Sequence, residues 1–301
     1  MRDSDLGKAW LDSLEHQRRL SPHTLANYSR ATDVLLKLKE KTDLRDVETQ
    51  QIRRFVAQLH GAGLSGRTLA LTLSAWRGLY RWLARHRGFA ANPVQGVRAP
   101  KAPRHLPGAL SVEQAQQLLE GLPAGAPPET PEGARDRAMF ELLYSSGLRL
   151  AELIALDAHD GRLDLRQAEV TVTGKGGKTR TVPVGARARD ALRAWLKSRA
   201  LLAAPQERAL FVGARGRRIA AGSVQARLRA WARRRGLGAS VHPHMLRHSF
   251  ASHVLQSSQD LRAVQEMLGH ASISTTQVYT HLDFQALARV YDAAHPRARK
   301  K

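Results

Sequence analysis

Residues 90–108 read Ala90-Ala-Asn-Pro-Val-Gln-Gly-Val-Arg-Ala-Pro-Lys-Ala-Pro-Arg-His-Leu-Pro-Gly108. This stretch contains four prolines and shows no long apolar period, which is typical of a linker. It therefore predicts two domains, over residues 1–89 and 109–301, joined by residues 90–108. A chain of 301 residues is long enough for each domain to bury a core of its own.

The charge of the chain predicts a polyanionic partner. Lys and Arg number 48 against 26 Asp and Glu, a net charge of +22, and 38 of the basic residues are Arg. Arginine suits bidentate binding of phosphate, although a GC-rich coding bias also raises its frequency. No acidic residue lies between Glu48 and Glu113 or between Glu207 and Asp260, yet each interval holds ten basic residues. We expect a phosphate-binding surface in each half, the alternative being a basic surface that only serves solubility.

Composition excludes several other classes of protein. There are no cysteines, so disulfides, Cys-type zinc sites and thiol nucleophiles are excluded. A hydrophobic content of 43% is too high for a mainly disordered basic tail. No apolar run approaches the roughly 18 residues of a membrane span, and the first ten residues lack the apolar core of a signal peptide. We expect a folded, soluble, cytoplasmic protein.

The segment before the linker is predicted to be helical. Ser21 and Pro22 mark a helix start, with a capping hydroxyl and a first-turn proline, and the helix should reach about residue 39. Further helices are predicted over residues 47–59 and 66–87. The aromatic residues of the last helix are interpreted as core. The basic residues outside its apolar stripe and those of the linker are the candidate DNA contacts: Arg67, Arg77, Arg81, Arg85, Arg98, Lys101 and Arg104.

The segment after the linker is predicted to be helices interrupted by one β-hairpin. Ser111-Val-Glu-Gln114 has the pattern of a capping box. A proline-rich loop is expected at 123–131, and strands at 169–173 and 179–184 flank a glycine-rich turn. Helices are predicted over residues 135–144, 186–202, 223–235, 243–256, 260–268 and 284–293. The fold class is therefore mainly α with a small β element.

The densest cluster of reactive side chains lies in residues 242–253. His244 and Arg247 are three apart on a predicted helix and so project from one face, with Pro243 at the first turn. Taken alone this spacing is weak, and a solvated face would explain it. A zinc site is disfavoured because His244 and His248 lack the intervening Glu of a metalloprotease.

A conjunction of six residues is more specific. In chain order they are Arg149, Lys175, His244, Arg247, His270 and Tyr279. Their order and local sequences resemble the tyrosine recombinase family. Residues 21–28, 99–107, 280–285 and 290–298 resemble the bacterial Xer branch of that family, so the likeness covers essentially the whole chain.

The resemblance implies a role for each of these residues. Tyr279 would attack the scissile phosphate and give a 3′-phosphotyrosyl intermediate, while Arg149 and Arg247 would clamp the non-bridging oxygens. Lys175 would protonate the leaving 5′-oxygen, and His244 and His270 would bind the phosphate and assist proton transfer. Glu152, one helical turn after Arg149, would orient that arginine rather than touch DNA. No cofactor or metal is implied.

The resemblance also implies an architecture and partners. The first domain would be a four-helix SAM-like core-binding domain and the second a mixed α/β catalytic domain, forming a C-shaped clamp on double-stranded DNA. A tail from about residue 284 to 301 would dock on a neighbouring subunit, although packing on its own chain fits the sequence equally well. The enzyme would resolve chromosome and plasmid dimers at a dif-like site, in a heterotetramer with a XerD-like recombinase activated by an FtsK-like translocase, in the nucleoid-associated cytoplasm.

Three alternatives remain open on sequence grounds. A phage-like or integron-like integrase shares the six residues and acts on other sites. A DNA-binding architectural protein needs the arginines but has no use for Tyr279 or Lys175. A metal-dependent nuclease would require carboxylate clusters, which residues 208–259 lack.

Overall fold

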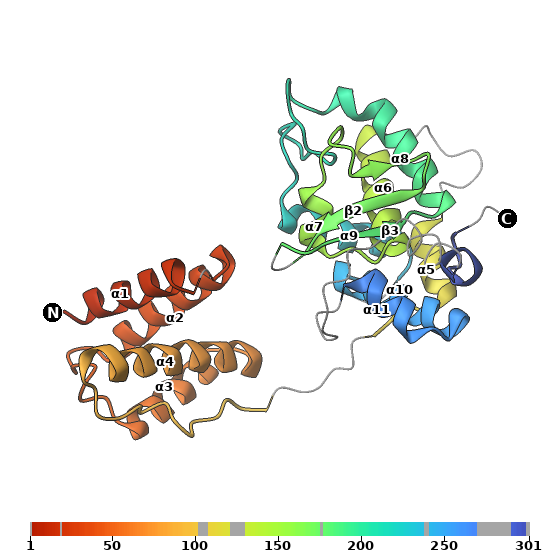
Figure 1. Cartoon of the computed structure of the whole chain (residues 1–301). Helices are drawn as coiled ribbons and strands as arrows, with labels where there is room; N and C mark the ends of the chain where they lie inside the picture. The colour runs from red at the N-terminus through yellow and green to blue at the C-terminus, as the bar shows by residue number, and fades with distance from the viewer. Residues whose placement is uncertain are drawn as a thin grey trace. The chain divides into compact units, whose positions relative to one another are not determined.

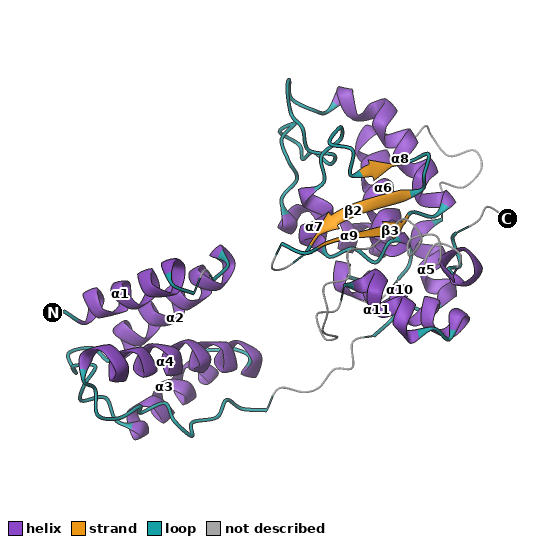
Figure 2. Cartoon of the chain, viewed as in Figure 1, coloured by secondary structure: helices purple, strands orange, loops and turns teal. Residues whose placement is uncertain are grey.

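The computed structural model describes residues 2–18, 20–101, 108–120, 130–174, 177–237, 241–269 and 290–298. The chain divides into two compact units, Met1–His105 and Leu106–Lys301. In the described part of the chain, strands occur only in the second unit and the first is helical (Figure 2). No described helix is both long enough and apolar enough to cross a membrane.

The first unit consists of four helices around one core. The helices are α1 (Asp3–His16), α2 (Pro22–Leu38), α3 (Thr49–Gly61) and α4 (Gly66–Arg87). Ser21 and Ser65 cap α2 and α4 with their hydroxyls, as the sequence predicts. Trp76 is fully buried and donates its indole N–H to the Ala31 carbonyl at 2.6 Å, which ties α4 to α2. The predicted four-helix architecture is confirmed for this unit.

The core of the first unit extends into the segment predicted as a linker. Val94 and Val97 are buried in it. Asn92 donates its side-chain amide to the Arg77 carbonyl at 3.2 Å, and the Arg77 guanidinium donates to the Val97 carbonyl at 3.4 Å. The chain therefore stays attached to α4 for about ten residues beyond the helix, because its apolar side chains cover the core.

The second unit surrounds a central helix and carries a three-stranded antiparallel sheet of order β1-β2-β3 (Figure 1). The strands are β1 (Leu163–Asp164), β2 (Glu169–Thr173) and β3 (Thr179–Pro183). The helices are α5 (Val112–Leu119), α6 (Pro131–Ser145), α7 (Leu150–Ala155), α8 (Ala186–Ser198), η1 (Arg199–Leu201), α9 (Ala221–Arg234), α10 (Pro243–Ser258) and α11 (Leu261–Leu268). The predicted hairpin, with Thr171 opposite Thr181, is confirmed.

Three elements of the second unit differ from the sequence prediction. Helix α6 begins at Pro131, inside the stretch predicted as a loop, because Thr130 caps it and a proline is tolerated at the first helical position. Helix α7 has six residues and β1 has two, too few for a periodic pattern to appear. Helix α6 is buried nearly all round, which makes it the centre of this unit.

The last described segment, residues 290–298, packs on its own chain. Tyr291 is buried, and its hydroxyl lies 2.7 Å from the Ser145 hydroxyl at the end of α6. The Arg297 guanidinium forms an ion pair with the buried carboxylate of Glu141. These contacts hold residues 290–298 to α6. Docking of the tail on a neighbouring subunit, expected from about residue 284, stays a prediction. Residues 284–289 lie outside the described part.

Candidate active site

Arg149 is the N-cap residue of α7. Its backbone N–H donates to Glu152 Oε2 at 2.8 Å, and its Nη1 donates to Glu152 Oε1 at 2.8 Å. The Arg149 side chain keeps 39% of its surface accessible, whereas that of Glu152 keeps only 3%. A half-exposed guanidinium is thus held by a buried carboxylate one helical turn away, the arrangement expected for Glu152.

A second guanidinium holds the same carboxylate from the sheet. Arg180, on β3, donates Nη1 to Glu152 Oε1 at 2.7 Å and Nη2 to Glu152 Oε2 at 2.8 Å. Burial opposes ionisation of Glu152, but the hydrogen bonds from Arg180 and Arg149 outweigh it and lower its pKa to about 2. The carboxylate is therefore charged at neutral pH.

Arg180 was missed by the sequence analysis, although a signal for it exists. It has the same parity as Val182 in β3 and as Val184 directly after the strand, both buried, so its side chain points to the core face. An arginine on the core face of a strand requires a buried carboxylate or carbonyl partner.

Arg247 reaches the same region from α10. It is 7% exposed and donates Nη1 to the Gly147 carbonyl at 2.5 Å and Nη2 to the Leu268 carbonyl at 2.6 Å. Burial and the neighbouring charges of Arg149 and Arg180 lower the pKa of its guanidinium to about 10, so it remains charged at neutral pH. Arg149 donates Nη2 to the next carbonyl, that of Gly269, at 3.3 Å. The two arginines predicted to bind one phosphate thus meet at adjacent carbonyls.

His244 lies on the same helix as Arg247, in its first turn. Pro243 occupies the first helical position, and the His242 ring caps the helix by accepting from the Met245 N–H at 3.2 Å. The His244 ring is exposed and stacks on that of His242, with centroids 6.4 Å apart. His244 is thereby accessible at a helix N-terminus, a position that favours anions.

The other three predicted catalytic residues, Lys175, His270 and Tyr279, lie outside the described residues. The described residues that directly precede Lys175 and His270 nevertheless reach the arginine cluster. A Cβ built on Gly174 would lie 3.5 Å from Glu152 Oε1 and 3.6 Å from Arg149 Nη1. Gly269, whose carbonyl binds Arg149, directly precedes His270 in the chain.

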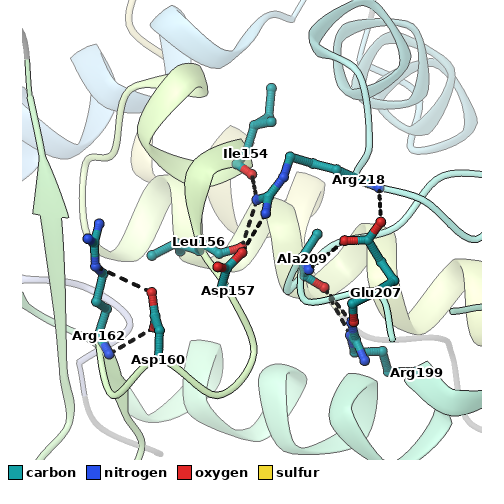
Figure 3. A network of polar contacts seen from close by, with 9 residues as sticks. All are labelled: Ile154, Leu156, Asp157, Asp160, Arg162, Arg199, Glu207, Ala209 and Arg218. Atoms are coloured by element: carbon teal, nitrogen blue, oxygen red, sulfur yellow. Dashed lines mark hydrogen bonds and ion pairs between the residues drawn. The ribbon is translucent and has the colours of Figure 1, made fainter. Parts of the chain in front are cut away.

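Two arginines of the acid-free interval 208–259, Arg218 and Arg227, hold elements of the fold together. Arg218 donates to Asp157 Oδ1 at 2.5 Å and to the Ile154 carbonyl at 2.6 Å (Figure 3). These contacts hold the C-terminal end of α7, the helix that begins after Arg149. Arg227 similarly donates to the buried Asp136 at 2.8 Å. At these two positions the fold uses the guanidiniums to join its own elements, and the phosphate-binding surface expected in this half stays a prediction.

The candidate DNA contacts of the first half differ in accessibility. Most of them are exposed, namely Arg67, Arg81, Arg85, Arg98 and Lys101. Arg77 is half-buried and donates to the Val97 carbonyl. Arg104 lies outside the described residues.

An apolar groove of about 680 Å³ lies between α7 and the start of α9. It is lined by Leu150, Ala151, Ile154, Ala155, Arg218, Ile219, Ala220 and Ala221.

Among the described residues, no three His, Asp or Glu side chains are grouped as metal ligands would be.

Comparison with known proteins shows the family to which this chain belongs. Residues 109–286 match the phage integrase family, and residues 8–87 match the phage integrase N-terminal SAM-like domain. The chain therefore belongs to the phage integrase family, and it is a tyrosine site-specific recombinase. This confirms the family, the fold class of two mostly helical domains, and the class of enzyme expected from the sequence.

Particular relatives are similar over almost the whole chain. The chain is 55% identical to tyrosine recombinase XerC 1 of Ralstonia nicotianae, over 97% of this chain and 94% of that protein. It is 52% identical to tyrosine recombinase XerC of Pseudomonas aeruginosa, over 97% of this chain and 95% of that protein. The likeness to the Xer branch is thereby confirmed.

Solved structures share the fold. The XerH site-specific recombinase bound to palindromic difH substrate, a post-cleavage complex, matches with a TM-score of 0.67 at 23% identity over 96% of this chain and 84% of that one. The integrase from mycobacterium phage Brujita matches with a TM-score of 0.51 at 25% identity, over 99% and 95% of the two chains.

Proposed function

We propose that this chain cuts and rejoins double-stranded DNA through a 3′-phosphotyrosyl intermediate at Tyr279. One observation carries the proposal: three guanidiniums, those of Arg149, Arg180 and Arg247, gather around one ion-paired carboxylate, Glu152. Among the described residues, three positive charges therefore face one negative charge at a site that is partly shielded from water. A phosphodiester bound there would supply the missing negative charge.

The arginines suit the transition state of phosphoryl transfer. Each guanidinium has five N–H donors, and the contacts given above use two on Arg149 and two on Arg247. The remaining donors would bind the non-bridging oxygens of the scissile phosphate. Because the protein contacts already fix both groups, little reorganisation is needed as charge develops in the transition state.

The remaining steps fall to residues assigned by the family likeness. The Tyr279 oxygen would form a bond to phosphorus while the bond from phosphorus to the 5′-oxygen breaks. His244 and His270 would take up the phenolic proton, and Lys175 would give a proton to the departing 5′-oxygen. The energy of the phosphodiester is kept in the phosphotyrosyl bond, so a 5′-hydroxyl can reverse the step and rejoin the strands without hydrolysis of a nucleotide.

Both units would contact the duplex. The exposed basic residues Arg67, Arg81 and Arg85 lie on α4, and Arg98 and Lys101 follow in the connecting segment. With Arg77 and Arg104, they would bind phosphates of the duplex while the second unit binds the scissile position. The two units would then enclose the DNA as a clamp.

The biological reaction would be resolution of chromosome and plasmid dimers at a dif-like site. The support is high identity to proteins named tyrosine recombinase XerC, together with a fold shared with a XerH recombinase bound to difH DNA. The chain would act in a heterotetramer with a XerD-like recombinase, stimulated by an FtsK-like translocase, in the cytoplasm at the nucleoid. A footprint on the native site, with and without the partner recombinase, tests this assignment: no protection in either case would refute it.

The covalent intermediate gives the direct test. The protein is incubated in EDTA with a nicked suicide duplex, and a covalent complex is sought on a denaturing gel beside Tyr279→Phe. We expect an adduct with the wild type and none with the variant. Cleavage that needs Mg²⁺ and leaves no adduct would instead establish a metal-dependent nuclease.

The proposed acid is tested by changing the leaving group. Lys175→Ala should still bind DNA but cleave slowly, because the 5′-oxygen must then depart without a proton. A bridging 5′-sulfur, which is a good leaving group when unprotonated, should restore the rate. If sulfur gives the variant no advantage over oxygen, Lys175 is not the acid.

A further inference from the structure

Arg180 joins three elements of the second unit through one side chain. Its guanidinium lies on β3, is 7% exposed, and makes the paired bonds to Glu152 of α7 described above. Its Nε donates to the Met267 carbonyl, in the last turn of α11, at 2.8 Å. All three of its guanidinium nitrogens already donate to protein acceptors, whereas the contacts of Arg247 given above use only Nη1 and Nη2. We therefore expect any part that Arg180 takes in the reaction to be exerted through its neighbours.

The end of α11 binds three arginines in order. The Met267 carbonyl accepts from Arg180, the Leu268 carbonyl from Arg247, and the Gly269 carbonyl from Arg149. The last carbonyls of a helix have no intrahelical donor and carry partial negative charge, which makes them good partners for guanidinium groups. Successive carbonyls thus hold the three guanidiniums in a fixed order.

The turn after α11 is fitted closely to Arg180. Gly269 has φ +61°, in the left-handed region, and a Cβ there would lie 2.9 Å from Arg180 Cδ. A side chain at this position would therefore displace the Arg180 side chain or the turn. The next residue in the chain is His270.

We infer that Arg180 is a positioning residue for phosphate cleavage, which fixes Arg149 through Glu152 and the end of α11 through the Met267 carbonyl. The inference rests on the proposed function and deepens it by adding a group that does not touch the substrate. Lysine cannot replace this group, because a single ammonium cannot hold both oxygens of the carboxylate and a carbonyl on another helix with the geometry of a planar guanidinium.

The experiment measures single-turnover adduct formation at saturating suicide DNA. Arg180→Lys keeps the charge and Arg180→Gln removes it, so that one variant remains informative if the other does not fold. Each is assayed on the normal scissile phosphate and on a methylphosphonate that lacks the negative charge. DNA affinity and the melting temperature are measured alongside.

The chain offers a matched control in Arg297. Its guanidinium also binds a buried carboxylate, that of Glu141, and donates to a backbone carbonyl, that of Leu119, at 3.2 Å. It makes no described contact with Arg149, Arg247 or α11. Arg297→Lys therefore shows how much stability is lost when a lysine replaces an arginine that binds a buried carboxylate and a carbonyl, away from the candidate site.

For Arg180→Lys we expect a fall of about 100-fold in the cleavage rate on the normal phosphate, since displacements of about 1 Å have effects of this size. DNA affinity should hardly change, because most contacts to the duplex lie elsewhere. On the methylphosphonate the loss should be much smaller, because the arginine clamp acts on the phosphate charge. Arg297→Lys should lower the melting temperature without a selective loss on the charged substrate.

The outcomes separate the inference from the function on which it rests. If the wild type forms no adduct, the proposed function fails. If the wild type forms an adduct, three results would show that Arg180 is not a positioning residue. Arg180→Lys could form the adduct as fast as the wild type, or its cleavage rate could fall by the same factor on both substrates. It could also behave as Arg297→Lys does. If neither protein cleaves the methylphosphonate, the comparison of Arg180→Lys with Arg297→Lys on the normal phosphate decides.

Discussion

Glu152→Gln should weaken the second unit in a way that depends on pH. The substitution keeps the shape of the side chain but removes the charge that Arg149 and Arg180 share. At neutral pH it leaves two guanidiniums without their carboxylate, and breaking a buried ion pair of this kind costs about 3–5 kcal/mol of unfolding free energy.

The pH dependence follows from the pKa of the Glu152 carboxyl. The folded structure lowers it from 4.5 to about 2. A depressed folded-state pKa adds stability that is fully present above pH 4.5 and is lost as the pH falls toward 2. The shift corresponds to about 3 kcal/mol in total, of which about 2 kcal/mol is lost by pH 3. The stability difference between wild type and Glu152→Gln should therefore narrow by about 2 kcal/mol between pH 7 and pH 3.

The two units must be followed separately because each has its own core. Fluorine NMR of the intact chain labelled with 5-fluorotryptophan does this during unfolding in urea. Trp195 and Trp231 report the second unit, whereas Trp10, Trp76 and Trp82 report the first, which should unfold identically in both proteins. A stability difference for the second unit that is equal at pH 7 and pH 3, or larger at pH 3, would refute the reasoning.

Two further predictions concern packing and charge. Gly147→Ala should lower the unfolding free energy of the second unit by about 2–5 kcal/mol, because Gly147 has φ +57° and a Cβ there would lie 2.4 Å from Phe250 Cδ1. Gly161→Ala is the control, since Gly161 has φ +74° but open space around it, and it should cost only about 1–2 kcal/mol in the same urea titration. DNA affinity should fall by about 10³-fold or more between 50 and 200 mM salt, and Arg81→Ala should reduce the slope against log salt by about one in a filter-binding titration. An unchanged slope would remove Arg81 from the phosphate contacts.

Much of the local structure could be predicted from the sequence. Helix α4 has the predicted bounds, Gly66–Arg87, because Ser65 caps its start and Gly88 ends it in the left-handed conformation. The β-hairpin was also predicted correctly, since alternation of side chains and a glycine-rich turn are features of neighbouring residues. Helix α7 was missed because six residues show no recognisable period.

The candidate site was predictable only in part. Arg149 and Arg247 came from a family likeness, and the expected contact of Glu152 with Arg149 agrees with helical spacing. The helical spacing of Arg149 and Glu152 does not predict that Arg180 also binds Glu152. Nor does it predict that successive carbonyls bind the three arginines. Those contacts join β3, α7, α10 and the end of α11.

The sequence by itself determined most of the longer helices, the β-hairpin and the family that the chain resembles, because these depend on neighbouring residues and on recognisable motifs. Only the tertiary structure decided the partners of Arg180 and Arg247. These two buried guanidiniums bind a carboxylate or carbonyls that packing brings within hydrogen-bonding distance, and these partners lie on other elements, far along the chain.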